Sequence, residues 1–367
     1  MAIKVCIIGA GNGAFAAAAD LTLRGYQVTI YENELFKSNV EDLMETGIIH
    51  CFGVGPVGDA KIYKVTCDLA DALSDVDIIM PIAPAYAQET VAKSLLPYIK
   101  PGDKIILTPG STGGSLIFGK VFHDNGKLDG VKIAEMHTLP YATRKVDSCT
   151  VDILLMCKKM YFAAFPAIYN QEMYDLVVKM FPSIELLKDV LETGMNNGNA
   201  VSHPAAVVLN AGKIEYYGKH YHYKEGITPS VAKVNEKIDE ERLAISAIFG
   251  YKPINARERL YEMGYCPMTD TLYESYQGSH EVFLPIEGPN DLSGRYLTED
   301  VPCALVAMSD IAKLVGVATP VMDSVVILAS ALRSEDYWTT GRTLEKMGLN
   351  GMTVDEIRDL LQNGYKI

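Results

Sequence analysis

A glycine-rich turn close to the N-terminus constrains the fold of this chain more than any other feature. Residues 3–8 form a short apolar run, and the turn Gly9-Ala-Gly11-Asn-Gly13-Ala14 follows directly. A helix of small residues is expected over residues 15–24 and a second strand over residues 27–31. This order is typical of a dinucleotide-binding βαβ unit, because glycines allow close backbone approach and helix N-terminal amides hold a pyrophosphate.

An acidic residue supports this interpretation. Glu32 follows the second strand and lies 23 positions after Gly9, close to the spacing of about 20 residues that separates the fingerprint from its ribose-binding carboxylate. A carboxylate accepts hydrogen bonds from the ribose hydroxyls and repels a 2′-phosphate, so NAD is favoured and NADP is the alternative. The predicted cofactor-binding residues are Gly9, Gly11, Asn12, Gly13, Ala14, Glu32 and Ala83.

Strands and helices continue to alternate through the first half of the chain, which predicts a Rossmann-like doubly wound α/β domain over residues 1–190. Ligands bind such sheets beyond the carboxyl ends of the strands, so Ala83 and Thr138 are expected to face the ligand. For Ala83 an ordinary strand-to-helix turn is the alternative. Further strands are expected at residues 48–52, 61–66, 77–81, 104–107 and 132–135, with helices near residues 68–73, 84–98 and 114–124.

From about residue 166 the periodicity becomes helical, which predicts an all-helical second domain over residues 191–367. His203 lies at the start of one of these helices, since Pro204 fits a first helical position. A catalytic proton donor and a plain helix cap both fit His203 there. The expected helices are at residues 167–181, 204–217, 229–249, 256–263, 302–315, 320–332 and 354–362.

Two other segments of this domain carry polar groups of interest. Arg295 and Asp300 precede a helix opened by Pro302, where an acidic residue complements the helix dipole even without a catalytic role. His220 and His222 lie in an aromatic stretch over residues 216–223. Two histidines without a third ligand nearby indicate a solvated loop, and no metal ligand is predicted anywhere in the sequence.

Composition limits the class of ligand. A net charge of −13 and a pI near 5.0 argue against nucleic acid or an anionic membrane as the main partner and favour small molecules. The seven cysteines are scattered without a CxxC pair, which is typical of reduced thiols in a cytoplasmic protein. The sequence leaves open whether two subunits form a homodimer.

Three further motifs give the sequence a family resemblance. They are Thr-Leu-Pro-Tyr-Ala-Thr-Arg at residues 138–144, Asn-Ala-Val-Ser-His-Pro at 199–204 continuing to Glu215, and Arg-Tyr-Leu-Thr-Glu-Asp-Val-Pro at 295–302. Together with the glycine turn, they resemble the opine dehydrogenases of the octopine and nopaline type. Members of that family join the amino group of an amino acid to the carbonyl of a 2-oxo acid and reduce the imine with a nicotinamide cofactor.

The resemblance implies a role for four residues. His203 matches the family's catalytic histidine, Asp300 its paired carboxylate, Arg295 the arginine that holds the oxo-acid carboxylate, and Thr138 a substrate-contacting position. An imidazole that titrates near neutrality suits the proton transfers of such a condensation. Two alternatives stay open: a reductase similar to ketopantoate reductase or glycerol-3-phosphate dehydrogenase, and a nucleotide-binding regulator without turnover.

Overall fold

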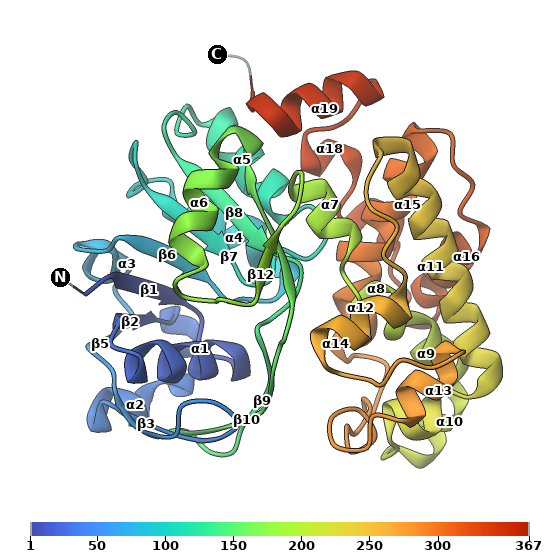
Figure 1. The fold of residues 1–367 in the computed structure, drawn as a ribbon, viewed down its shortest axis with the longest axis horizontal. Helices are drawn as coiled ribbons and strands as arrows, with labels where there is room; N and C mark the ends of the chain where they lie inside the picture. Colours follow the sequence, from blue (N-terminus) through green and yellow to red (C-terminus); the bar gives the residue numbers. More distant parts are fainter. Residues whose placement is uncertain (1, 366–367) are drawn as a thin grey trace. The chain divides into compact units, whose positions relative to one another are not determined.

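The computed structural model describes residues 2–365, and the chain divides into two compact units (Figure 1). The first unit comprises Met1–Gly110 and Ile117–Leu186, and the second comprises Ser111–Leu116 and Leu187–Ile367. The first unit contains the sheets, and the second is built from helices. The predicted fold class, a doubly wound α/β domain followed by a helical domain, is therefore confirmed.

The main sheet of the first unit has, among the described residues, eight strands in the order β12-β11-β8-β7-β6-β1-β2-β5. The six strands from β8 to β5 pair in parallel, and their order is that of dinucleotide-binding folds. The strands are β1 (Lys4–Ile8), β2 (Gln27–Tyr31), β5 (Lys64–Thr66), β6 (Ile78–Pro81), β7 (Lys104–Leu107), β8 (Lys132–Met136), β11 (Met160–Phe165) and β12 (Ile184–Leu186).

Helix α1 (Asn12–Leu23) lies between this sheet and a smaller one (Figure 1). Its alanines are fully buried because it contacts strands of both sheets, and larger side chains would hold the layers apart. The smaller sheet has the order β4-β3-β10-β9 in the part of the chain that the structure describes. Its strands are β3 (Ile48–Gly53), β4 (Gly58–Lys61), β9 (Tyr141–Lys145) and β10 (Thr150–Met156).

A buried carboxylate joins α1 to this smaller sheet. Asp20 on α1 is fully buried and accepts hydrogen bonds from Arg24 Nε at 2.9 Å and from the Tyr141 hydroxyl at 2.6 Å. A buried charge is tolerated only when it is paired and hydrogen-bonded, and Asp20 has both kinds of partner. Tyr141, which belongs to the sequence motif at residues 138–144, therefore has a structural contact in β9.

The remaining helices of the first unit are shorter, and several sequence predictions needed correction. The strand expected at residues 61–66 is divided between β4 and β5, which belong to different sheets. Strands β9 to β12 were not predicted, and the helix expected at 167–181 is confined to α6 and a preceding 3-10 turn. The helices are α2 (Glu41–Thr46), α3 (Leu69–Leu73), α4 (Gln88–Leu95), α5 (Gly114–Asp124) and α6 (Asn170–Val177).

Helix α11 (Pro229–Phe249) is the centre of the second unit. It begins at Thr228, whose side chain accepts from the Val231 N–H, and ends at Gly250 in the left-handed conformation. Helices α7 (Val190–Met195), α8 (Asn199–Ser202), α9 (Pro204–Leu209), α13 (Leu272–Gln277), α15 (Val306–Leu314) and α16 (Pro320–Arg333) pack against it.

The other helices of the second unit surround this core. The helix predicted at residues 204–217 is divided at Asn210 into α9 and α10. The remaining helices are α10 (Ala211–Tyr217), α12 (Ala256–Met263), α14 (Arg295–Thr298), α17 (Tyr337–Thr340), α18 (Leu344–Met347) and α19 (Val354–Asn363), with π-helical turns η4 (His222–Gly226) and η5 (Val301–Leu305). Across residues 2–365, no helix is long and apolar enough to cross a membrane.

Candidate active site

His203 stands between α8 and α9 in the second unit. Pro204 occupies the first turn of α9, as predicted, and His203 is the N-cap residue by position. Its side chain nevertheless makes no capping hydrogen bond to the backbone of α9. The imidazole is directed instead toward side chains of other elements, so the simple capping interpretation does not apply.

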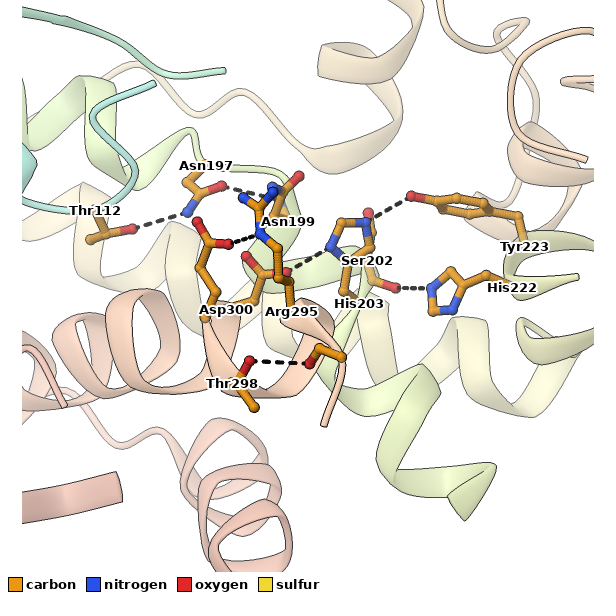
Figure 2. Close-up of polar contacts among 12 residues, drawn as sticks. Thr112, Asn197, Asn199, Ser202, His203, His222, Tyr223, Arg295, Thr298 and Asp300 are labelled. Atoms are coloured by element: carbon orange, nitrogen blue, oxygen red, sulfur yellow. Dashed lines mark hydrogen bonds and ion pairs between the residues drawn. The ribbon is translucent and has the colours of Figure 1, made fainter. Parts of the chain in front are cut away.

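Both ring nitrogens of His203 have hydrogen-bond partners (Figure 2). Nδ1 lies 2.8 Å from Oδ2 of Asp300, which directly precedes η5, and Nε2 lies 2.8 Å from the Tyr223 hydroxyl in η4. All three residues are buried. The fold thus brings together His203 and Asp300, which are 97 residues apart in the sequence.

Aromatic rings enclose the imidazole. Tyr296 on α14 stacks on His203 with centroids 3.8 Å apart and planes 13° apart. His222 approaches edge-on, at 5.5 Å between centroids. The stack fixes the ring plane, and the two hydrogen bonds fix its rotation within that plane.

Burial controls the charge of the pair. It lowers the pKa of His203 to about 3, although the nearby Glu299 carboxylate acts in the opposite direction, and it raises the pKa of Asp300. His203 is therefore uncharged at neutral pH in this state. We assign the Nδ1 proton to the bond with Asp300, which leaves Nε2 to accept from Tyr223.

Arg295 lies on α14, one turn before Asp300. Its Nε donates to Oε2 of Glu299 at 2.5 Å, and its side chain is 65% exposed whereas that of Glu299 is 8% exposed. Glu299 holds the guanidinium from one side while most of the Arg295 side chain stays accessible. A guanidinium held in this way suits bidentate recognition of a ligand carboxylate.

The prediction of a solvated loop around His220 and His222 was wrong, since both side chains are buried. Nε2 of His222 donates to the Ser202 carbonyl at 3.3 Å, and the Ser202 hydroxyl bonds the Tyr276 hydroxyl at 2.5 Å. The first contact joins η4 to α8, and the second joins α8 to α13. Within the described part of the chain, no group of three or more His, Cys, Asp or Glu side chains is arranged to hold a metal ion.

The glycine turn of the first unit has the geometry of a dinucleotide cradle. Gly9 has φ of +116°, and a Cβ there would lie 2.5 Å from the Ile82 carbonyl oxygen. A Cβ on Gly13 would lie 2.6 Å from Leu139, whereas among residues 2–365 nothing lies within 4 Å of one on Gly11. The N-terminus of α1 also has no side-chain cap within these residues. The turn therefore fits a pyrophosphate, because the described residues leave space beside Gly11 and place no side-chain cap on the N-terminal amides of α1.

The other predicted cofactor and substrate residues of this unit lie near strand ends. Glu32 follows β2 and is half-buried, with one carboxylate oxygen accepting from the Asn33 N–H at 2.9 Å. Asn12 accepts from the Lys145 N–H at 2.8 Å. Ala83 follows β6 and Thr138 follows β8, and both are half-buried, while Ala14 is buried in α1. Ala83 and Thr138 thus stand beyond the carboxyl ends of parallel strands.

Comparison with known proteins places these features in one family. Residues 186–333 match the family model described as "NAD/NADP octopine/nopaline dehydrogenase, alpha-helical domain". The chain is 35% identical to an opine dehydrogenase of Arthrobacter sp. strain 1C, over 97% of this chain and 98% of that protein. The chain belongs to the opine dehydrogenase family. The family resemblance read from the sequence motifs is therefore confirmed.

Solved structures of this family have the same fold. Octopine dehydrogenase in complex with NADH and L-arginine has a TM-score of 0.78 to this chain, at 20% identity, with 100% of this chain and 99% of that chain covered. Yersinopine dehydrogenase with bound NADP⁺ has a TM-score of 0.76 at 16% identity, with 99% and 98% covered. Both likenesses support the two-part architecture of this opine dehydrogenase family member.

Proposed function

We infer that this chain is an NAD(P)H-dependent opine dehydrogenase. It joins the amino group of an amino acid to the carbonyl carbon of a 2-oxo acid such as pyruvate, reduces the resulting imine, and catalyses the reverse oxidation. The observation that carries this inference is the buried His203–Asp300 pair. It lies in a chain that also has a glycine turn suited to a dinucleotide and is 35% identical to an opine dehydrogenase over 97% of its length. The reaction thus acts on the CH–NH bond of a secondary amine dicarboxylate.

The glycine turn and Glu32 would hold the nicotinamide cofactor. Gly9, Gly11 and Gly13, with Asn12 and Ala14, would bind the pyrophosphate at the N-terminus of α1. Glu32 favours NAD because its carboxylate repels a 2′-phosphate, although relatives bound to NADH and to NADP⁺ are both known. When bound, the reduced cofactor supplies the hydride that the imine carbon accepts.

His203 would move the protons of the condensation. Its resting imidazole is uncharged, so it can take a proton from the substrate ammonium and free the amine for attack. Asp300, at 2.8 Å from Nδ1, stabilises the imidazolium that forms. The imidazolium can then return the proton to the oxygen that departs as water.

Arg295 would bind the carboxylate of the 2-oxo acid. Its side chain is accessible and oriented by Glu299, and the carboxylate fixes the position of the carbonyl carbon next to it. Thr138, beyond β8, is proposed as a further substrate contact. The substrates are an amino acid and a 2-oxo acid, which is consistent with the acidic surface that disfavours nucleic acid.

Two further proposals concern the setting of the protein. We propose a reducing compartment such as the cytoplasm, because the seven cysteines are scattered through the sequence without a CxxC pair. We also keep the domain limits proposed from the sequence, residues 1–190 and 191–367, as the cofactor-binding and substrate-binding regions.

Omission of one substrate at a time tests the function. NADH absorbance is followed with a panel of amino acids plus pyruvate, and then with each component left out. An opine dehydrogenase consumes NADH only when both substrates are present. Consumption with the oxo acid alone would indicate a 2-oxo acid reductase, and NADH binding without consumption under any mixture would indicate a regulator.

A further inference from the structure

Tyr223 occupies the position from which His203 would exchange protons. Nδ1 of His203 faces Asp300, so Nε2 is the nitrogen available for transfer, and the Tyr223 hydroxyl lies 2.8 Å from it. A substrate group that exchanges a proton with Nε2 must therefore displace this hydroxyl or react through it.

The ring of Tyr223 is held independently of its hydroxyl. It stacks on Phe283 at 4.1 Å between centroids with planes 23° apart, and it lies 5.3 Å from the Tyr276 ring. The carbonyl of Tyr223 accepts from Gln277 Nε2 at 3.1 Å, which anchors η4 to α13. Moving the hydroxyl away from Nε2 would require the ring to move and would disrupt this packing. A reaction through the hydroxyl therefore needs less rearrangement of the protein than its displacement.

The hydroxyl also has capacity for a second partner. A phenol donates one hydrogen bond and accepts up to two. Among the described residues, His203 Nε2 is the hydrogen-bond partner of the Tyr223 hydroxyl, and this bond uses the donor. The oxygen lone pairs stay available to accept a proton from a substrate ammonium.

We propose that Asp300, His203 and Tyr223 form a proton relay, in which the Tyr223 hydroxyl is the group that contacts the reacting atoms. This assignment rests on the proposed opine dehydrogenase function. When the ammonium substrate binds, one of its N–H protons passes to the Tyr223 oxygen while the hydroxyl proton passes to Nε2. One N–H and one O–H bond break and one of each forms, which leaves a neutral amine, an imidazolium and an unchanged phenol.

The dehydration step uses the same relay in reverse. The Nε2 proton of His203 passes to the Tyr223 oxygen, and the hydroxyl proton passes to the carbinolamine oxygen. The C–O bond breaks with its electron pair on oxygen, water leaves, and the nitrogen lone pair forms the C=N bond. Because both protons move together, tyrosinate does not accumulate, which agrees with the burial that raises the pKa of Tyr223.

Tyr223→Phe tests the relay because it removes the hydroxyl and retains the ring that stacks on Phe283. The expected kcat is lower by roughly 10²-fold, in the range of a lost general acid or base. The pKa seen in the pH profile of kcat/KM rises, since the hydroxyl that stabilised neutral Nε2 is gone. The groups that face His203 and Tyr223 otherwise remain in the variant; they are Asp300, Glu299, Arg295, His222, Tyr296, Tyr276 and Tyr265.

Tyr276→Phe is the matched control, because it deletes a buried hydroxyl that bonds Ser202 and does not bond His203. It is expected to keep the wild-type pH profile. A Tyr223→Phe enzyme with kcat within about threefold of wild type and an unshifted profile would overturn the relay, since general acid–base groups contribute far more.

A proton inventory of the wild-type enzyme tests the relay without any variant. In mixtures of H₂O and D₂O, two protons in flight predict a curved dependence of kcat on the deuterium fraction, and a linear dependence would contradict the relay. The substrate-omission panel on the same wild-type enzyme separates the two failures. NADH consumption that needs both substrates, combined with a linear inventory, rejects the relay and retains the opine dehydrogenase function.

Discussion

Replacing Asp300 with Asn changes the central pair at one atom. The amide keeps the shape of the carboxylate and can still bond Nδ1 of His203, but it cannot carry the negative charge that would stabilise an imidazolium 2.8 Å away. At an effective dielectric constant of about 20, two unit charges at this distance attract by about 6 kcal/mol. Loss of this attraction destabilises the imidazolium that forms on His203 during the reaction.

The expected result of Asp300→Asn is a fall in kcat of roughly 10²–10⁴-fold. The sign of the pH effect follows from the same charge. Without Asp300 the pKa of His203 falls further, so the imidazolium that returns a proton to the departing oxygen persists only at lower pH. The optimum for NADH consumption therefore moves toward acid, as measured from kcat over a pH series with saturating substrates.

A matched control separates this effect from the general loss of one carboxylate. Glu225→Gln removes an exposed carboxylate of the same unit that pairs with Lys213, and it should leave the pH profile in place. The reasoning would be refuted if Asp300→Asn kept kcat within about threefold of wild type and an unshifted pH optimum. An attraction of about 6 kcal/mol between Asp300 and the imidazolium cannot be lost without changing the rate or the optimum.

Four more substitutions follow from the structure. Arg295→Lys should raise the KM of the oxo acid by roughly tenfold or more while that of NADH stays near wild type, because an ammonium cannot make the bidentate contact; equal changes in both would indicate a structural role. Gly9→Ala should destabilise the fold by about 1–3 kcal/mol in urea unfolding, since its Cβ would lie 2.5 Å from the Ile82 carbonyl oxygen. Gly11→Ala should retain stability and weaken NADH binding. The opposite pattern would contradict the roles given to these two glycines. Glu32→Gln should narrow the preference for NADH over NADPH in KM measurements by removing the repulsion of the 2′-phosphate, and an unchanged ratio would exclude that role.

The sequence predicted the N-terminal strand, glycine turn and helix well because the signal is local. Gly9 needs a positive φ and Gly13 close packing, and both demands are met within one strand, turn and helix. The strands β9 to β12 were missed for the opposite reason. The buried run Met160–Phe165 is too short for periodicity to distinguish a strand from a helix, and its pairing with β8 and β12 is a tertiary contact.

Of the candidate site, the sequence anticipated the contact between His203 and Asp300 but not the contact with Tyr223. His203 and Asp300 were paired on the strength of a family resemblance, and their hydrogen bond joins residues 97 positions apart that no local pattern connects. Tyr223 was read as part of a solvated loop because His220 and His222 have no third metal ligand nearby in the sequence. Its ring stacks on Phe283, which lies 60 positions later in the sequence. This tertiary contact makes the segment part of the candidate site.

Formation of the secondary amine tests the central claim most directly. The protein is incubated with a ¹⁵N-labelled amino acid, pyruvate and NADH, and the product is identified by mass spectrometry while NADH oxidation is followed. We expect one N-(1-carboxyethyl) amino acid that retains the labelled nitrogen for each NADH oxidised. Oxidation of NADH accompanied by lactate, with the labelled amino acid recovered unchanged, would contradict the claim.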